Sequence, residues 1–143
     1  MRKAVVLSLL GRQSYVGQEP DEIELVTEGT LEDIGDGWEL RYEESTLTGM
    51  QDVVTTFRVQ GKTVTLTRSG RLNSQMVFIE GIPHDSLYQT EFGALMLNVC
   101  ATKVDANITA DGGVVDLLYN IEIEQNSAGT VDYHLEIKAK ENA

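Results

Sequence analysis

Hydrophobic and polar residues alternate with a period of two along nearly the whole chain. Successive side chains of a β-strand point to opposite faces of its sheet, so this alternation predicts strands with one apolar face each. No segment of useful length has the 3.6-residue period of an amphipathic helix. The predicted strands are Ala4 to Leu10, Glu22 to Ile34, Trp38 to Glu44, Val53 to Val59, Lys62 to Ser69, Ser74 to Ile82, Leu87 to Phe92, Ala94 to Asn107, Val115 to Ile123 and Val131 to Ile137.

Short turns separate these strands. Asp36-Gly37, Gln60-Gly61 and Asp111-Gly112-Gly113 are typical of tight hairpin connections. Tight connections favour an antiparallel meander, which buries one face of every strand most simply by closing into a barrel. We therefore expect residues 1–143 to form one all-β domain, an antiparallel meander β-barrel of about 8–10 strands. A sandwich, which usually needs longer crossing connections, is the alternative.

The same alternation assigns an inward and an outward face to each strand. A register error of one residue would invert the whole set of a strand, so each strand is a separate test. The residues predicted to be buried are Trp38, Tyr42, Phe57, Leu66, Phe78, Tyr119 and Leu135, and those predicted to face solvent are Glu39, Arg41, Thr63, Thr65, Asp132 and His134.

The charge balance narrows the range of partners. The chain has 11 Lys+Arg against 23 Asp+Glu, a formal net charge of -12. Phosphate backbones and anionic membranes repel such a surface, and no basic stripe offsets it, so we expect neither nucleic-acid nor membrane binding. Solubility is the simplest role of the acidity. We expect a monomer or a homodimer.

Cysteine and histidine give no sign of a metal or redox site. The single Cys100 excludes an intrachain disulfide, and its apolar surroundings favour an inert buried thiol. His134 alternates outward beside Asp132 and Glu136, which is more typical of a solvated face than of a metal site. We expect no metal and no cofactor. The apolar run near the N-terminus is short, is followed at once by Arg12 and lacks a small-residue cleavage site, so we interpret it as a strand of a cytoplasmic protein.

Arg68 breaks the pattern of its strand. Val64, Leu66 and Arg68 share one face while the intervening threonines share the other, so the alternation directs Arg68 inward. A guanidinium held on an apolar face needs a partner, and one that points into a cavity is a candidate ligand-binding group.

Glu44 extends the apolar face of Trp38, Leu40 and Tyr42. One predicted strand lies between this strand and that of Arg68. A Glu and an Arg held close together at low dielectric stabilise each other's charged forms. Alternatively, both residues plug the barrel mouth or form a buried ion pair without any ligand. The candidate ligand-binding residues that could line one end of the interior are Arg68, Glu44, Tyr42, Tyr88, Thr90 and Met76.

Six short stretches of the sequence form a recognisable set: Tyr42-Glu43-Glu44, Gly49, Thr55-Thr56, Arg68-Ser69-Gly70, Ser74-Gln75-Met76-Val77-Phe78 and Tyr88-Gln89-Thr90-Glu91-Phe92-Gly93. Together they resemble the YwiB-like family of small bacterial proteins. The resemblance spans about Lys3 to Lys138 and implies a calycin-like (lipocalin-like) β-barrel, a cytoplasmic setting and no assigned activity. Several of the family's signature residues coincide with the candidate site residues.

Three functions fit these observations. The first is a barrel that binds a small anionic or carboxylate-bearing molecule through Arg68, in its cavity or at its mouth, without catalytic residues. The second is an enzyme acting on a small aromatic acid, by fold-level analogy with the phenolic-acid decarboxylases among calycin-like barrels; Arg68 would then orient the carboxylate and Glu44 act as acid or base. The third is a non-catalytic interaction protein with a packed core.

Overall fold

The computed structural model describes residues 2–15, 17, 19–44, 52–90, 93–123 and 126–140. Within these residues the chain is built from ten strands, and none of them is helical. The strands are β1 (Arg2–Tyr15), β2 (Asp21–Asp33), β3 (Trp38–Glu43), β4 (Val53–Gln60), β5 (Thr63–Gly70), β6 (Asn73–Phe78), β7 (Pro83–Thr90), β8 (Gly93–Thr109), β9 (Gly112–Ile123) and β10 (Asn126–Ala139).

Each strand is antiparallel to the next one along the chain, and the sheet closes on itself. β1 pairs with β10 from Val5 opposite Ala139 to Tyr15 opposite Gly129, and with β2 on its other side. The predicted all-β class and the closed antiparallel meander are therefore confirmed.

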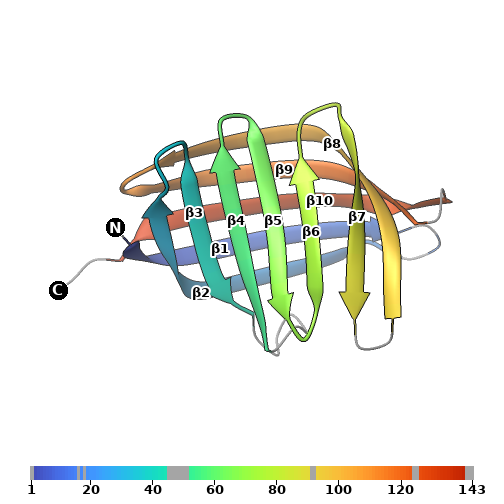
Figure 1. The fold of residues 1–143 in the computed structure, drawn as a ribbon, viewed down its shortest axis with the longest axis horizontal. Helices are drawn as coiled ribbons and strands as arrows, with labels where there is room; N and C mark the ends of the chain where they lie inside the picture. Colours follow the sequence, from blue (N-terminus) through green and yellow to red (C-terminus); the bar gives the residue numbers. More distant parts are fainter. Residues whose placement is uncertain are drawn as a thin grey trace.

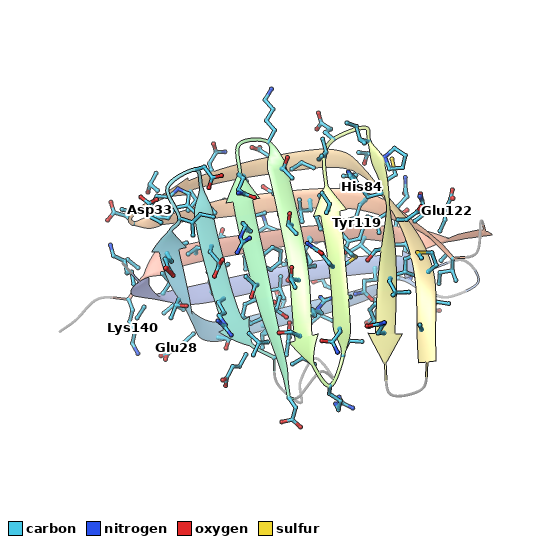
Figure 2. All side chains as sticks on the ribbon, viewed as in Figure 1. Glu28, Asp33, His84, Tyr119, Glu122 and Lys140 are labelled. Carbon is cyan, nitrogen blue, oxygen red and sulfur yellow. The ribbon has the colours of Figure 1, made fainter. Side chains whose placement is uncertain are left out.

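The barrel has two layers of strands (Figure 1). The shorter strands β3–β7 lie in front and cross the long strands β1, β2, β9 and β10 steeply. β8 belongs to both layers, because its residues 93–100 pair with β7 whereas residues 97–109 pair with β9. The register with β9 shifts between Ala101 and Lys103, an irregularity of the kind that lets a strand bend. Charged side chains such as Glu28, Asp33, Glu122 and Lys140 point away from this barrel (Figure 2).

Inward side chains form layers of opposed residues inside the front strands. Leu40, Phe57, Leu66 and Met76 are opposite one another across β3–β6 and are all buried. The predicted inward faces are confirmed, except that Trp38 is only partly buried. On the predicted outer faces Arg41 and Asp132 are exposed, whereas Glu39, Thr63, Thr65 and His134 are partly exposed.

The strand bounds differ most around β6 and β7. β6 ends at Phe78 instead of Ile82, and β7 begins at Pro83 instead of Leu87. The start of β7 escapes prediction because its apolar pattern is inverted: Ser86 is buried, whereas Leu87 is 45% exposed on the outer face. Phe92, predicted to end this strand, lies outside the described residues.

β6 and β7 share the shortest ladder among the described strands. Asn73 pairs with Gln89 and Ser74 with Tyr88, and the ladder then stops. Beyond it, the Ser86 hydroxyl donates a hydrogen bond to the carbonyl oxygen of Gln75. Here a side-chain hydrogen bond connects the two strands, as backbone hydrogen bonds do between other strands of the barrel.

We expect Gly29→Ala to destabilise the barrel by about 1–3 kcal/mol, the usual cost of overpacking. A Cβ at Gly29 would lie 2.5 Å from the carbonyl oxygen of Arg41 and 3.1 Å from Leu7 Cδ1, so β2 and β3 would have to move apart. Gly11→Ala is the matched control, because a Cβ there meets nothing within 4 Å. Urea unfolding of both variants provides the measurement, and equal losses of stability would contradict the packing seen at Gly29.

Candidate functional site

A row of polar side chains crosses the interior of β3–β7 near one end of the barrel. Its members lie directly opposite one another in successive strand pairs. The apolar layer that contains Phe57 and Leu66 lies next to it, and on β4 the buried Val53 lies on its other side. The members of this polar row are Tyr42, Thr55, Arg68, Ser74 and Tyr88.

Glu44 is tied to the middle of the polar row. Its side chain is buried, and its Oε1 accepts a hydrogen bond of 2.6 Å from the hydroxyl of Thr55, which is opposite Arg68 in the sheet. The ion pairs among the described residues do not include one between Glu44 and Arg68. Within the described part of the chain, Glu44 therefore bonds to the neutral hydroxyl of Thr55 and does not form the ion pair with Arg68 that the sequence allowed.

Tyr42 meets a residue from the opposite wall. Its hydroxyl lies 3.3 Å from that of Tyr133 on β10, and both side chains are buried. Burial raises the pKa of Tyr42 well above the ordinary value, the Glu44 carboxylate adds to the rise, and the Arg68 guanidinium partly offsets it. Burial likewise raises the pKa of Tyr133. Both phenols therefore remain neutral hydrogen-bonding groups at physiological pH.

A cavity of about 300 Å³ lies beside the polar row. Aliphatic side chains from β8, β9 and β10 form most of its wall, and polar groups come from β1, β5, β7 and two further tyrosines. Among the described lining residues Arg68 has the only charge, and none of them is an aspartate or a glutamate. The lining consists of Gln13, Arg68, Met76, Tyr88, Leu95, Leu97, Tyr119, Ile121, Ile123, Val131 and Tyr133.

Arg68 brings an unsatisfied donor to this cavity. The side chain is partly buried, and its Nε is buried without a hydrogen-bond partner among the residues that the structure describes. A buried polar group left in this way costs about 1–3 kcal/mol. The guanidinium is thus a positively charged donor that the described protein groups do not saturate.

Three of the six residues predicted for the site line the cavity together: Arg68, Met76 and Tyr88. Tyr42 reaches it indirectly through the hydroxyl of Tyr133. Glu44 lines a separate surface depression formed by β2 and β3. Thr90 ends β7, and its side chain lies outside the described residues.

The sequence-based prediction missed Thr55, Ser74 and Tyr133. Each is on a face that the alternation assigns inward, so their direction was readable. Their partners could not be predicted from the alternation. Tyr133 meets Tyr42 only because the barrel closes, and the contacts of Thr55 and Ser74 depend on the strand register. A hydroxyl on an otherwise apolar inward face was the available signal.

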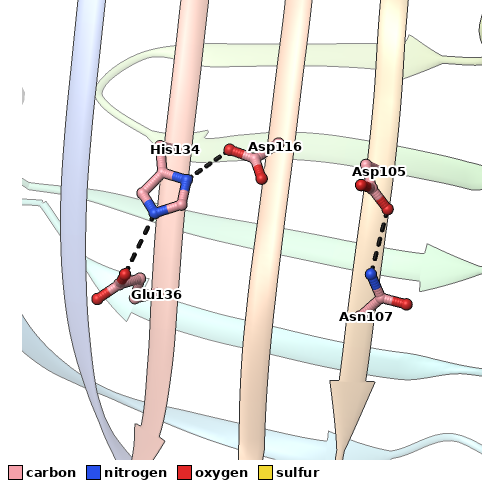
Figure 3. Close-up of polar contacts among 5 residues, drawn as sticks. All are labelled: Asp105, Asn107, Asp116, His134 and Glu136. Carbon is pink, nitrogen blue, oxygen red and sulfur yellow. Dashed lines mark hydrogen bonds and ion pairs between the residues drawn. The ribbon is translucent and has the colours of Figure 1, made fainter.

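A second cluster of titratable groups lies on the outside of β8–β10 (Figure 3). The ring nitrogens of His134 contact the carboxylates of Asp116 and, at 3.3 Å, Glu136. Asn107 donates a hydrogen bond of 3.2 Å to Asp105 nearby. No group of three or more His, Cys, Asp or Glu side chains in the described ranges is placed to hold a metal ion. The described residues also include no helix long and apolar enough to cross a membrane.

We expect stability to fall as the pH rises above about 10, the ordinary pKa of tyrosine. Tyr42 and Tyr133 have raised pKa values in the folded state, so the unfolded chain releases their protons first and is favoured at alkaline pH. Tyr42→Phe should lower the free energy of unfolding at neutral pH by about 1 kcal/mol and flatten its alkaline decline. Urea unfolding at pH 7 and above pH 10 measures both effects. Ionisation of all tyrosines near pH 10 in the folded protein would contradict this prediction.

We expect His134 to stabilise the fold at acidic pH. Hydrogen bonds to Asp116, then to Glu136, raise its pKa, so its contribution is complete below about 6.5 and is lost as the pH rises through the folded-state pKa. His134→Gln should therefore lower the thermal midpoint more at pH 5 than at pH 8. An equal loss at both pH values would show that the contacts do not depend on the ring's charge.

The comparisons with known proteins agree with this architecture. Residues 7–137 match the model of a family described as a domain of unknown function, DUF1934. The crystal structure of the ywiB protein from Bacillus subtilis is similar at 17% sequence identity and a TM-score of 0.87, covering 98% of this chain and 94% of that one, which shows a shared fold. No curated protein matches the chain. The chain therefore belongs to the DUF1934 family, and its resemblance to YwiB-like proteins is confirmed.

Proposed function

We propose that this barrel binds a small anionic or carboxylate-bearing molecule, held by Arg68 in the cavity beside the polar row. The observation that carries the proposal is Arg68, which lines that cavity and whose buried Nε has no hydrogen-bond partner among the described residues. Guanidinium donors match the geometry of carboxylates closely. The ligand would supply the acceptor that the described side chains do not.

The rest of the cavity supports a compact and mostly apolar ligand. A volume of about 300 Å³ is at the lower end of the range for small-molecule sites. Leu97, Ile121 and Val131 offer contact area, and the hydroxyls of Tyr88 and Tyr133 offer a few polar contacts. In a protein with a net charge of -12, Arg68 is the one charged residue of the described cavity lining, and its positive charge favours an anion locally.

Binding is better supported than catalysis on a small aromatic acid. The enzymatic alternative needs Glu44 as an acid or base beside the substrate, whereas Glu44 bonds to Thr55 and lines a different depression. A general acid or base must come within hydrogen-bonding distance of the reacting group. The cavity likewise favours ligand binding over a solid core that serves only external interactions. A cytoplasmic location and a monomeric or homodimeric state are retained as parts of the proposal.

We expect Arg68→Met to fold and to be as stable as the wild type or more stable by about 1 kcal/mol, because it removes an unsatisfied buried donor. The same variant should lose the rise in thermal midpoint that small carboxylates give to the wild type. Arg58→Met is the matched control: it makes the same charge change at an exposed residue of β4 that pairs with Glu39.

The measurement is a thermal-shift series with small apolar carboxylates and their uncharged amides, followed by calorimetric titration. A loss of about 3 kcal/mol or more in Arg68→Met would indicate a structural ion pair and contradict the proposal. Equal ligand-induced shifts in Arg68→Met and the wild type would contradict it as well.

A further inference from the structure

The register places a second unsatisfied donor directly opposite Arg68. Ser74 on β6 pairs with Arg68 on β5, and its Oγ is buried without a hydrogen-bond partner among the residues described. The described residues contain three such buried side-chain atoms: Arg68 Nε, Ser74 Oγ and His84 Nε2. Two of the three therefore belong to one cross-strand pair.

This coincidence calls for a physical cause. Buried polar groups in folded proteins are nearly always hydrogen-bonded, and each exception costs about 1–3 kcal/mol. Thr55, on the other side of Arg68, follows the rule by donating to Glu44. The Arg68–Ser74 pair departs from it at two opposed positions. Arg68 lines the cavity, and Ser74 lies in the polar row between two lining residues, Arg68 and Tyr88.

We propose that Arg68 and Ser74 together form the binding seat for the carboxylate of a monoanionic ligand with a compact apolar body. Opposed residues of an antiparallel pair have Cβ atoms about 4.5–5.5 Å apart, so the two oxygens of one carboxylate can accept from both donors. This inference rests on the proposed function and deepens it, because it names a second binding residue and the class of headgroup.

The charge of the cavity favours a carboxylate over a phosphate. One guanidinium compensates one negative charge, and the described lining contains no second cation. A phosphate monoester has a charge near -2 at neutral pH and three strong acceptor oxygens. Beside it, Met76, Leu97, Ile121 and Val131 offer apolar surface rather than donors. A phosphate would therefore leave most of its second negative charge uncompensated by the described lining.

Calorimetric titration of the full chain with phenylacetate and cyclohexanecarboxylate tests this seat, with phenylacetamide and phenyl phosphate as comparison ligands. We expect Ser74→Ala to weaken binding of the better carboxylate about tenfold, because a hydrogen bond to a charged group is lost. Ser69→Ala, an exposed neighbour of Arg68, is the matched control and should bind like the wild type. Phenyl phosphate should bind at least tenfold more weakly than the carboxylates.

The outcomes distinguish failure of the two-donor seat from failure of the proposed function. Carboxylate binding that depends on Arg68 but is unchanged in Ser74→Ala would overturn the two-donor seat and leave the proposed function standing. Phenyl phosphate binding as tightly as the carboxylates would overturn the ligand class. If none of these ligands binds the wild type, both proposals fail. Unfolding curves of Ser74→Ala, expected to show a stability equal to or above that of the wild type because an unsatisfied buried hydroxyl is removed, show that any loss of binding does not reflect misfolding.

Discussion

Closure of the sheet between β1 and β10 is the constraint on which the rest of the structure depends. Because β1 pairs on both sides, every strand sends alternate side chains into one shared interior. Full burial of a side chain such as Phe57 or Phe78 contributes about 2 kcal/mol, and closure extends that gain to all ten strands described. The same closure confines every inward polar group, which must find its partner inside the barrel.

The polar row shows how this confinement is resolved. Tyr42 meets Tyr133, and Thr55 meets Glu44, so these groups satisfy one another. Arg68 and Ser74 retain donors that the described protein groups leave unpaired. The neighbouring layer of Leu40, Phe57 and Leu66 contains apolar side chains alone. The apolar layer, which stabilises the fold, and the polar row, which contains the candidate binding residues, are thus neighbouring layers of the same barrel interior.

Much of the fold could be predicted from the sequence, because a period of two specifies both the strands and their inward faces. Val64 and Leu66 were enough to direct Arg68 inward. Prediction failed where the pattern was inverted, as at Ser86 and Leu87 on β7. It also could not reach contacts that arise from register or closure, such as Ser74 opposite Arg68 or Tyr133 beside Tyr42. Local alternation gives the direction of a side chain, not its partner.

The short ladder between β6 and β7 affects where the barrel wall opens locally. Local opening costs least where backbone hydrogen bonds are fewest, so this join is the first part of the wall expected to separate in the native state. Ser74 lies in that ladder, opposite Tyr88, whereas Arg68 is also held by the full-length pairing of β5 with β4. Parting of the wall would move Ser74 away from Tyr88 and leave the guanidinium in place. The same few backbone bonds therefore govern both access to the interior and the completeness of the polar row.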